Sequence, residues 1–329
     1  MVDDWFIPVL ASGGYRMITL KASESAKSLD VMPEVIGELR RTGASRDNRL
    51  LAIGGGVVQD VTGFVASIYM RGIQWSYVPT TLLAMVDSCI GGKSSINVGQ
   101  YKNLVGTFHP PLRILVDPSL ALSLSTEQKV SGLIEACKIC YCHGPETFDK
   151  YLQLQPSASL PLDRIEQIVH LSLLSKKWFI ETDEFDRADR LLLNFGHTFG
   201  HALEGASHFR ISHGVAVGLG ILCALRLGEL LGRPYRESSR ARALAAHIQE
   251  LLGEVPRLAD ELITTSVQDV LERFEADKKH LSDKYSVIVI AESDKVEILR
   301  FPKRPAFLQS VHAAISDVFA SWSLTEFRA

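Results

Sequence analysis

The chain has 329 residues, of which 46% are hydrophobic and 22% charged, and its formal net charge at pH 7 is -3. This composition is typical of a globular protein, and the length is sufficient for two domains. A net charge this small creates no field that would favour nucleic acid or an anionic membrane, so we expect neither as a partner. Local basic residues must therefore bind any anionic ligand.

The same sequence indicates a cytoplasmic location. No N-terminal run has the pattern of a signal peptide, and no uninterrupted apolar stretch approaches the ~18 residues of a membrane span. Five cysteines are an odd number, which fits reduced thiols better than a disulfide framework. Cys137-x-x-Cys140-x-Cys142-His143 could hold zinc, but no second pair of cysteines follows it. We interpret these cysteines as buried small hydrophobes on one helix face.

Strands and helices alternate over the first part of the chain. The predicted strands are residues 16–21, 50–53, 74–78 and 113–116, with a helix ending near Gly43 and another after the glycines at 54–56. Such alternation predicts parallel strands joined by right-handed crossovers, with a ligand site at the carboxyl ends of the strands. We expect a Rossmann-like domain over residues 1–126.

The later part of the chain has mainly helical periodicity. The predicted helices are residues 127–142, 163–180, 190–206, 213–232, 236–252 and 306–320. Only residues 285–299 predict a hairpin, with a turn at Ser293-Asp294. The predicted fold class is therefore α/β, with a Rossmann-like parallel-sheet domain followed by a mainly α-helical domain over residues 127–329.

Three consecutive glycines follow the second predicted strand. Gly54-Gly55-Gly56 would let the backbone approach a pyrophosphate, and the N-terminus of the next helix favours negative charge. The spacing is not G-x-G-x-x-G, and a tight structural turn explains the glycines equally well. Asp60 could accept a hydrogen bond from a ribose or nicotinamide, or cap the helix.

Residues 78–111 place basic and small polar residues together. Lys93, Lys102 and Asn103 lie among glycines and hydroxyl side chains close to Asp87, in what we expect to be a glycine-rich loop. Such an arrangement binds phosphate without a large basic patch. A lone lysine is more often a solvated surface residue. The clustering favours a phosphate site.

Further polar residues have spacings typical of a catalytic metal site. Glu135 and a histidine pair at His197 and His201 are followed by His213. One carboxylate and two imidazoles can hold a divalent metal and leave a coordination position open for substrate. Because residues four apart share a helix face, the spacing alone makes both His197 and His201 candidate ligands. A structural role for the pair is the alternative.

Taken in order, these motifs carry a family resemblance over nearly the whole chain. They are GGGVVQD, YMRG, VPTTLLAMVDS, GGK, KNLVGTFHPP, LIEACK, LNFGHTFGHALE, SHG and DKK. The sequence resembles the 3-dehydroquinate synthase family of sugar phosphate cyclases. Iron-dependent alcohol and glycerol dehydrogenases share the glycine loop and the histidine helix but lack the complete set.

The resemblance implies two cofactors. A divalent metal, usually Zn2+ with Co2+ as a substitute, would be held by Glu135, His197 and His213, which leaves His201 for proton handling or phosphate contact. NAD would be bound by residues of the first domain, namely Glu24, Lys27, Gly55, Gly56, Val57, Asp60, Thr80, Thr81, Lys102 and Ser123.

The resemblance also implies the residues that contact a sugar phosphate. The catalytic set would be Asp87, Lys93, Lys138, Lys176, Asp186, Arg190, Asn194 and His201. Further substrate contacts would come from Arg71, Asn103 and one or both of Lys278 and Lys279. In the family the arginine that matches Arg71 reaches the neighbouring subunit's site, so a homodimer is expected.

The implied reaction converts 3-deoxy-D-arabino-heptulosonate 7-phosphate to 3-dehydroquinate and phosphate. It combines oxidation, β-elimination, reduction and intramolecular aldol closure. Arg190 would select this substrate, since a guanidinium pairs bidentately with a carboxylate.

The sequence also departs from the family pattern. The glycine loop begins at residue 54, earlier than is usual, Ser94-Ser95 replaces Thr-Gly, and Asp186 replaces Glu. These differences indicate a divergent, N-terminally short member. The alternatives are a cyclase of sedoheptulose 7-phosphate or a similar neutral sugar phosphate, a polyol dehydrogenase of the same fold, and a non-catalytic homologue.

Overall fold

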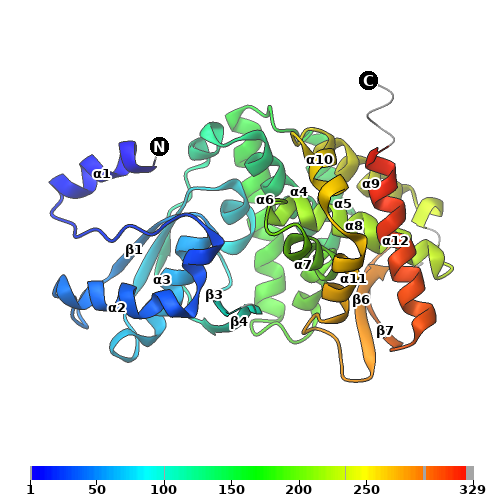
Figure 1. Ribbon diagram of the computed structural model, residues 1–329. Helices are drawn as coiled ribbons and strands as arrows, with labels where there is room; N and C mark the ends of the chain where they lie inside the picture. Colours follow the sequence, from blue (N-terminus) through cyan, green and yellow to red (C-terminus); the bar gives the residue numbers. More distant parts are fainter. Residues whose placement is uncertain (1, 100, 234, 292–293, 324–329) are drawn as a thin grey trace. The chain divides into compact units, whose positions relative to one another are not determined.

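The computed structural model describes residues 2–99, 101–233, 235–291 and 294–323. The chain divides into two compact units, Met1–Leu124 and Ser125–Ala329 (Figure 1). Each unit has its own buried core, so each is described by itself.

The first unit contains a parallel sheet. Its strands are β1 (Leu50–Gly54), β2 (Trp75–Pro79) and β5 (Arg113–Ile114), in the order β1-β2-β5. Both pairings are parallel, and the register of β1 and β2 runs from Leu50 opposite Trp75 to Gly54 opposite Pro79. The predicted parallel arrangement is confirmed, although β5 is shorter than the predicted strand.

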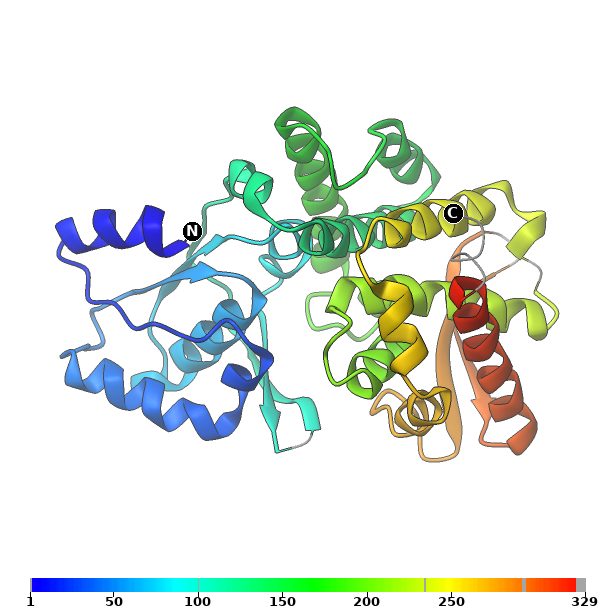
Figure 2. The same ribbon diagram turned by 45° about the horizontal axis from the view of Figure 1, so that its top comes forward.

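Helix α3 (Gly56–Ile68) packs on β1 and β2, and α2 (Met32–Arg41) packs on α3. These elements lie close together in both views (Figures 1 and 2). Gly43, with φ of 81°, follows α2 as the sequence predicts. The remaining helical elements of the unit are α1 (Val2–Ser12), η1 (Glu24–Lys27), η2 (Leu29–Val31), η3 (Tyr69–Arg71), η4 (Ala84–Ser88) and η5 (Pro118–Ser123).

Two predictions for this unit are wrong. Residues 16–21 form no strand, because no sheet among the described residues offers them a partner. The segment expected to be a glycine-rich loop instead contains an antiparallel hairpin of β3 (Lys93–Val98) and β4 (Tyr101–Phe108). Its small residues serve close strand packing, since a Cβ at Gly106 would lie 2.1 Å from the carbonyl oxygen of Ser94.

The second unit is built around α8 (His213–Leu230), which is buried along most of its length. Helices α4 (Thr126–His143), α7 (His197–Ala206), α9 (Ser239–Gly253) and α12 (Pro305–Ser323) all pack against it. A helix that is apolar on every face requires such cover. The other helical elements are α5 (Pro145–Gln153), α6 (Leu162–Thr182), α10 (Leu258–Thr264), α11 (Val267–Glu275), η6 (Asp189–Asn194) and η7 (Tyr235–Glu237).

Within the described part of the chain, α8 alone has the length and apolar composition that a membrane span needs. However, 78% of the qualifying window is buried inside the protein. Its apolar surface is therefore already covered by protein, as expected of a core helix.

The predicted C-terminal hairpin is confirmed. Strands β6 (Lys284–Ile290) and β7 (Val296–Pro302) pair in antiparallel register from Lys284 opposite Pro302 to Ile290 opposite Val296. In the predicted turn, Asp294 has a φ of 63°, whereas Ser293 lies outside the described residues. Phe307 of α12 stacks on Tyr285 and Phe301, which attaches the hairpin to that helix.

The helix predicted over residues 190–206 is broken in two. Element η6 ends at Asn194, and α7 begins at His197 after Gly196, whose φ is 79°. A Cβ at Gly196 would lie 2.7 Å from both Ile221 Cγ1 and the Val217 carbonyl oxygen of α8. Close packing against α8 therefore requires the glycine that ends the continuous helical pattern.

Candidate functional site

In the first unit, the glycine turn lies beside the residues that follow β2. The Thr80 N–H donates to the Gly54 carbonyl at 2.9 Å, so the carboxyl ends of the two strands lie next to each other. Gly55 is the N-cap of α3, and a Cβ there would lie 3.0 Å from Thr81 Cγ2. At Gly56 an added Cβ would meet only Ser88 Oγ, at 4.0 Å. The backbone at the helix N-terminus can thus be approached closely by an anionic ligand.

Asp60 is held by groups from two other segments. Its Oδ2 lies 2.6 Å from Lys27 Nζ, and the Ser95 N–H and hydroxyl donate to its two oxygens at 3.2 Å each. Burial raises the pKa of Asp60, whereas Lys27 and the hydrogen bonds from Ser95 act in the opposite direction. Asp60 therefore joins η1, α3 and β3 and does not cap α3.

Glu24 and Lys102 belong to a neighbouring polar cluster. Glu24 Oε1 accepts a hydrogen bond from Asn97 Nδ2 at 2.9 Å and lies 3.9 Å from Lys102 Nζ. Asn97 Oδ1 in turn accepts the Asn103 N–H at 2.8 Å. Since Lys27 Nζ lies 3.8 Å from the same Glu24 oxygen, these contacts connect four of the predicted cofactor residues.

Four other predicted residues of this unit lie on turns and strand ends. Asp87 belongs to the π-helical turn η4, Lys93 begins β3, and Ser123 ends η5, where its hydroxyl donates to the Leu120 carbonyl at 2.7 Å. Arg71 is exposed, with a φ of 69° between Met70 and Gly72, which also have positive φ. Such backbone strain in non-glycine residues is concentrated at functional sites.

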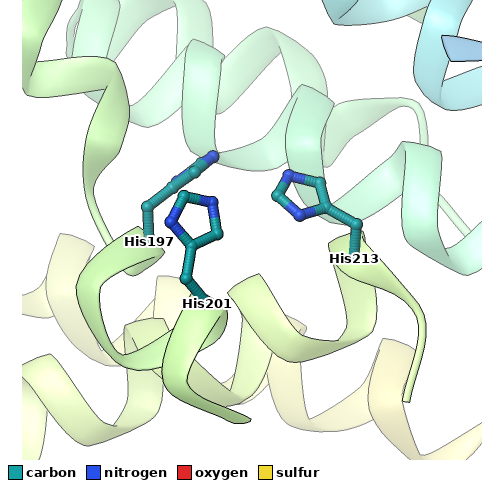
Figure 3. Close-up of side chains that lie close together, drawn as sticks. All are labelled: His197, His201 and His213. Carbon is teal, nitrogen blue, oxygen red and sulfur yellow. The ribbon is translucent and has the colours of Figure 1, made fainter. Parts of the chain in front are cut away.

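In the second unit, the predicted metal ligands come from three helices. His197 and His213 are the first residues of α7 and α8, and Glu135 lies in the middle of α4. The ligand atoms of His197, His201 and His213 all lie within 4.8 Å of one another. Figure 3 shows these three imidazoles gathered around one point.

Small residues bring the three helices close enough to form this cluster. A Cβ at Gly214 would lie 2.1 Å from the Ser131 carbonyl oxygen of α4, and the Gly214 N–H donates to Ser131 Oγ at 2.9 Å. A Cβ at Gly220 would lie 2.1 Å from the carbonyl oxygen of Gly196. The glycines at these contacts therefore determine the spacing of the candidate ligands.

Glu135 is the point on which two of the imidazoles converge. It is fully buried, and its Oε1 lies 3.7 Å from His197 Nε2 and 3.6 Å from His213 Nε2. Its other oxygen, Oε2, pairs with Lys138 Nζ on the same helix. His201 completes the histidine group beside these ligands, with ring centroids 5.2 Å from His197 and 5.7 Å from His213.

The donor atoms of this cluster fit a divalent metal. Glu135 Oε1 accepts no hydrogen bond from any described residue, although a buried oxygen normally has a partner. His197 Nδ1 lies 3.3 Å from the Phe195 carbonyl oxygen, which leaves Nε2 directed at Glu135. Burial, assisted by Lys138 and the neighbouring histidines, holds the pKa of His197 well below its usual range. A neutral imidazole and an unpaired carboxylate oxygen are the states that a metal requires.

The pKa of His197 predicts how the stability of the metal-free chain changes with pH. At pH 5.5 the unfolded His197 is mainly protonated while the folded one stays neutral, so stability is lost as the pH falls below about 6.5. The free energy of unfolding, measured with denaturant, should fall between pH 7.5 and pH 5.5 in the unmodified chain. In His197→Gln this fall should be smaller by up to about 1.4 kcal/mol. An equal loss in both proteins would contradict this prediction.

The four predicted lysines of this unit are buried to different degrees. Lys138 and Lys176 are buried, on α4 and α6. Burial lowers the pKa of Lys279, whose Nζ lies 3.6 Å from Asp277 Oδ2, and the charge of Lys138 lowers it further. Lys278 is exposed. Lys279 thus interacts electrostatically with His197 of the candidate metal cluster.

The other predicted substrate residues lie between α6 and α7. Arg190 is buried, and its Nη1 donates to the Glu184 carbonyl at 2.6 Å, while Asn194 Nδ2 donates to Leu191 at 3.1 Å. Asp186, the third predicted residue here, has a φ of 59°. Asp183, which the sequence did not indicate, accepts backbone N–H groups from Arg187, Ala188 and Arg190, and these bonds lower its pKa. This carboxylate orders the loop that contains Asp186 and Arg190.

Among the described residues, the cysteines of α4 belong to no group of side chains placed to hold a metal ion. Cys137 and Cys140 are fully buried, and burial raises the pKa of Cys137 well above its usual range and those of Cys140 and Cys142 to about 12. A metal-binding cysteine must be a thiolate. The interpretation as buried small hydrophobes is confirmed for Cys137 and Cys140, whereas Cys142 is partly buried.

Glu204 is a site residue that sequence reasoning missed. Its Oε2 lies 3.0 Å from His213 Nδ1, on the side of the ring opposite Glu135. The signal was present in the spacing, because positions 197, 201 and 204 share one face of α7. The proximity of His213 could not be inferred in the same way, since it belongs to another helix.

Solved structures with the same fold include several sugar phosphate cyclases. A 2-deoxy-scyllo-inosose synthase bound to carbaglucose-6-phosphate, NAD+ and Co2+ has a TM-score of 0.83 and 23% identity, covering 96% of this chain and 87% of that one. ValA, a 2-epi-5-epi-valiolone synthase from Streptomyces hygroscopicus subsp. jinggangensis 5008 with NAD+ and Zn2+, has a TM-score of 0.79 and 24% identity over 97% and 89% of the two chains. A probable glycerol dehydrogenase from Sinorhizobium meliloti 1021 is less similar, with a TM-score of 0.62 and 16% identity over 96% and 89%. These structures define the fold class as dehydroquinate synthase-like α/β, as predicted.

Sequence comparisons identify the family within that class. The 3-dehydroquinate synthase N-terminal model matches residues 17–131, and the C-terminal model matches residues 132–280. The 3-dehydroquinate synthase of Dictyoglomus turgidum is 38% identical over 86% of this chain and 78% of its own length. That of Latilactobacillus sakei is 34% identical over 89% and 80%. The chain belongs to the 3-dehydroquinate synthase family, which confirms the resemblance seen in its motifs.

Proposed function

We propose that this protein converts 3-deoxy-D-arabino-heptulosonate 7-phosphate to 3-dehydroquinate and phosphate. It would thus be a carbon-oxygen lyase acting on phosphates. The observation that carries the proposal is the convergence of His197 and His213 on the unpaired oxygen of Glu135, in a chain of this family. A metal and a redox cofactor suit a conversion that oxidises a hydroxyl, eliminates phosphate, reduces the ketone and closes a ring.

Glu135, His197 and His213 are the residues that would hold the metal, with Zn2+ preferred and Co2+ as a substitute. When bound, the metal polarises a substrate hydroxyl and NAD accepts and later returns a hydride. Lys138 orients Glu135 through their ion pair. His201, beside both histidine ligands, can hold or pass a proton without being needed for coordination.

We propose that NAD is bound by the first unit. The backbone of Gly55, Gly56 and Val57 at the start of α3 would meet the pyrophosphate, with Thr80 and Thr81 beside it. Glu24, Lys27, Asp60 and Lys102 form a connected set of charges that would orient the rest of the cofactor. Ser123 is the remaining proposed contact.

The proposed substrate contacts are mainly cations and amides. Lysines, arginine and asparagine suit a ligand with one carboxylate and one phosphate. Lys279 has a lowered pKa, so it can lose its proton more readily than an exposed lysine. The residues proposed to contact the substrate are Asp87, Lys93, Asn103, Lys138, Lys176, Asp186, Arg190, Asn194 and Lys279.

Two further proposals concern assembly and location. We expect a homodimer in which the exposed Arg71 reaches the neighbouring subunit's site, because its strained turn holds it on the surface. We also expect the protein to work in the cytoplasm, since an odd number of cysteines fits reduced thiols better than a disulfide framework.

The proposed function is tested by incubating the full chain with the heptulosonate phosphate, NAD and Zn2+. Phosphate release and formation of the carbocycle, without net accumulation of NADH, are expected. A polyol dehydrogenase would accumulate NADH in proportion to product. Absence of phosphate release from a chain that binds metal and NAD would refute the proposal.

Arg190 provides a test of substrate choice. Arg190→Ala should lower kcat/KM for the heptulosonate phosphate by about 10- to 150-fold. This factor corresponds to the ~1.5–3 kcal/mol that a hydrogen bond to a charged group contributes. Steady-state phosphate release measures the change, and Arg187→Ala, an exposed arginine of the same loop, is the matched control. If the unmodified protein instead prefers sedoheptulose 7-phosphate and Arg190→Ala leaves that turnover unchanged, the substrate is a neutral sugar phosphate.

A further inference from the structure

Glu204 is a buried carboxylate in direct contact with a candidate metal ligand. It lies on α7 with 3% of its surface exposed, and its Oε2 is 3.0 Å from His213 Nδ1. Burying a carboxylate is costly unless it is paired and hydrogen-bonded. Its contact with an imidazole that faces Glu135 therefore indicates a role at the metal cluster.

The geometry of the His213 ring determines which nitrogen carries the proton. A carboxylate at Nδ1 accepts a hydrogen bond, so Nδ1 is the protonated nitrogen of the neutral ring. The lone pair on Nε2 is then directed at Glu135 Oε1, 3.6 Å away. His197 is arranged in the same way, with the Phe195 carbonyl oxygen 3.3 Å from its Nδ1. Both candidate ligands thus offer the same nitrogen, but the Nδ1 of His213 contacts a side chain and that of His197 a backbone carbonyl.

The side chain of Glu204 has a task distinct from that of its backbone. The Glu204 carbonyl accepts hydrogen bonds from the Phe209 N–H at 2.8 Å and the Ser207 hydroxyl at 3.1 Å, which end the helix. The carboxylate instead contacts the first residue of α8. Removing the carboxylate would leave the C-terminus of α7 with its backbone contacts.

We propose that Glu204 is a positioning residue for the metal site. It keeps His213 in the tautomer with hydrogen on Nδ1, fixes the plane of the ring, and makes Nε2 a stronger donor to a divalent cation. Metal-binding histidines commonly donate their second N–H to a carboxylate in this way, and such partners tune metal affinity. The inference rests on the metal assigned under the proposed function, and it concerns a residue that acts on the metal through His213.

The first test measures metal affinity directly. In chelator competition with the full chain, Glu204→Ala should bind Zn2+ and Co2+ about 10- to 100-fold more weakly. The visible spectrum of the Co2+-loaded protein should change as well, because the ligand field depends on the orientation of the His213 ring. Glu204→Gln keeps an acceptor oxygen, so its affinity should fall between those of Glu204→Ala and the unmodified protein.

Ser207→Ala is the matched control for a general loss of stability. It removes a buried hydroxyl from the same helix end, where Ser207 contacts the Glu204 carbonyl and accepts the Ile211 N–H, but it does not contact His213. It should lower the unfolding midpoint and leave the Co2+ spectrum unchanged. Equal losses of affinity in Ser207→Ala and Glu204→Ala would overturn the proposal, as would unchanged affinity in a folded Glu204→Ala.

A second measurement separates this inference from the proposed function. Nitrogen-15 NMR of the histidine-labelled, metal-free chain reports the tautomer of His213 without any bound metal. The Nδ1–H form should dominate in the unmodified protein and in Glu204→Gln, whereas Glu204→Ala should populate both tautomers. If the unmodified chain binds neither Zn2+ nor Co2+, the proposed function fails. The positioning role of Glu204 is refuted separately if Glu204→Ala leaves the tautomer unchanged.

Discussion

Replacing Glu135 with glutamine is expected to abolish tight metal binding and lower phosphate release about a thousandfold. Glu135 supplies the only carboxylate of the proposed ligand set, and its buried Oε1 is the atom on which His197 and His213 converge. The polarisation that a metal supplies amounts to several kcal/mol, and each ~1.4 kcal/mol corresponds to a factor of ten in rate. Metal content after dialysis and phosphate release measure the two effects.

The same substitution should also destabilise the fold, because Lys138 would lose the charge of its partner. Lys138 is 2% exposed, and removing one member of a buried ion pair costs about 3–5 kcal/mol. The double variant Glu135→Gln with Lys138→Met should therefore recover stability in denaturant unfolding without recovering metal binding. Recovery of both properties would show that Glu135 acts through stability alone.

A matched control for charge is Glu146→Gln, which changes an exposed carboxylate in the first turn of α5. It should leave metal content and turnover unchanged and alter stability by less than about 0.5 kcal/mol. A fully active, metal-loaded Glu135→Gln protein would remove the basis of the proposed site.

Gly220→Ala is expected to produce the second large effect. The added Cβ would lie 2.1 Å from the Gly196 carbonyl oxygen and 2.8 Å from the Gly200 nitrogen, two atoms that form the first hydrogen bond of α7. Since neither backbone atom can move without its helix, α7 must shift away from α8. We expect a loss of about 1–3 kcal/mol in unfolding free energy, together with weaker metal binding as His197 moves with α7.

Gly228→Ala on the same helix is the matched control. A Cβ there would meet nothing closer than the Arg233 carbonyl oxygen at 3.6 Å, an ordinary contact. This substitution should stabilise α8 by about 0.5–1 kcal/mol, because alanine has the higher helix propensity. Denaturant unfolding and chelator competition on both variants provide the comparison. Similar behaviour of the two variants would show that the separation of α7 and α8 does not control the site.

Local patterns in the sequence were sufficient for many elements of the fold. The buried strands around Leu50 and Trp75, the helix after the glycines and the late hairpin follow from hydrophobic periodicity and turn residues within a few positions. The segment at residues 16–21 has a similar strand pattern but forms none. A strand also needs a neighbour for its backbone hydrogen bonds, and that depends on the rest of the fold.

The break at Gly196 and the hairpin at Lys93–Phe108 also differ from what the local sequence pattern predicts. The helical pattern continues through Gly196, but packing against α8 requires a left-handed residue there. In the hairpin, Gly106 permits close approach of β3 and β4, although glycine by itself favours a loop. In both cases a contact distant in the chain outweighs local preference.

For the site, the sequence by itself identified the family and indicated the candidate ligands, through ordered motifs that need no knowledge of packing. Spacing within α7 made His197 and His201 equivalent candidates. Only the tertiary structure decided that His197 and His213 meet Glu135 and that Glu204 lies behind His213. The reason is physical: the period of a helix relates side chains on one helix, whereas contacts between α4, α7 and α8 depend on close approach at Gly214 and Gly220.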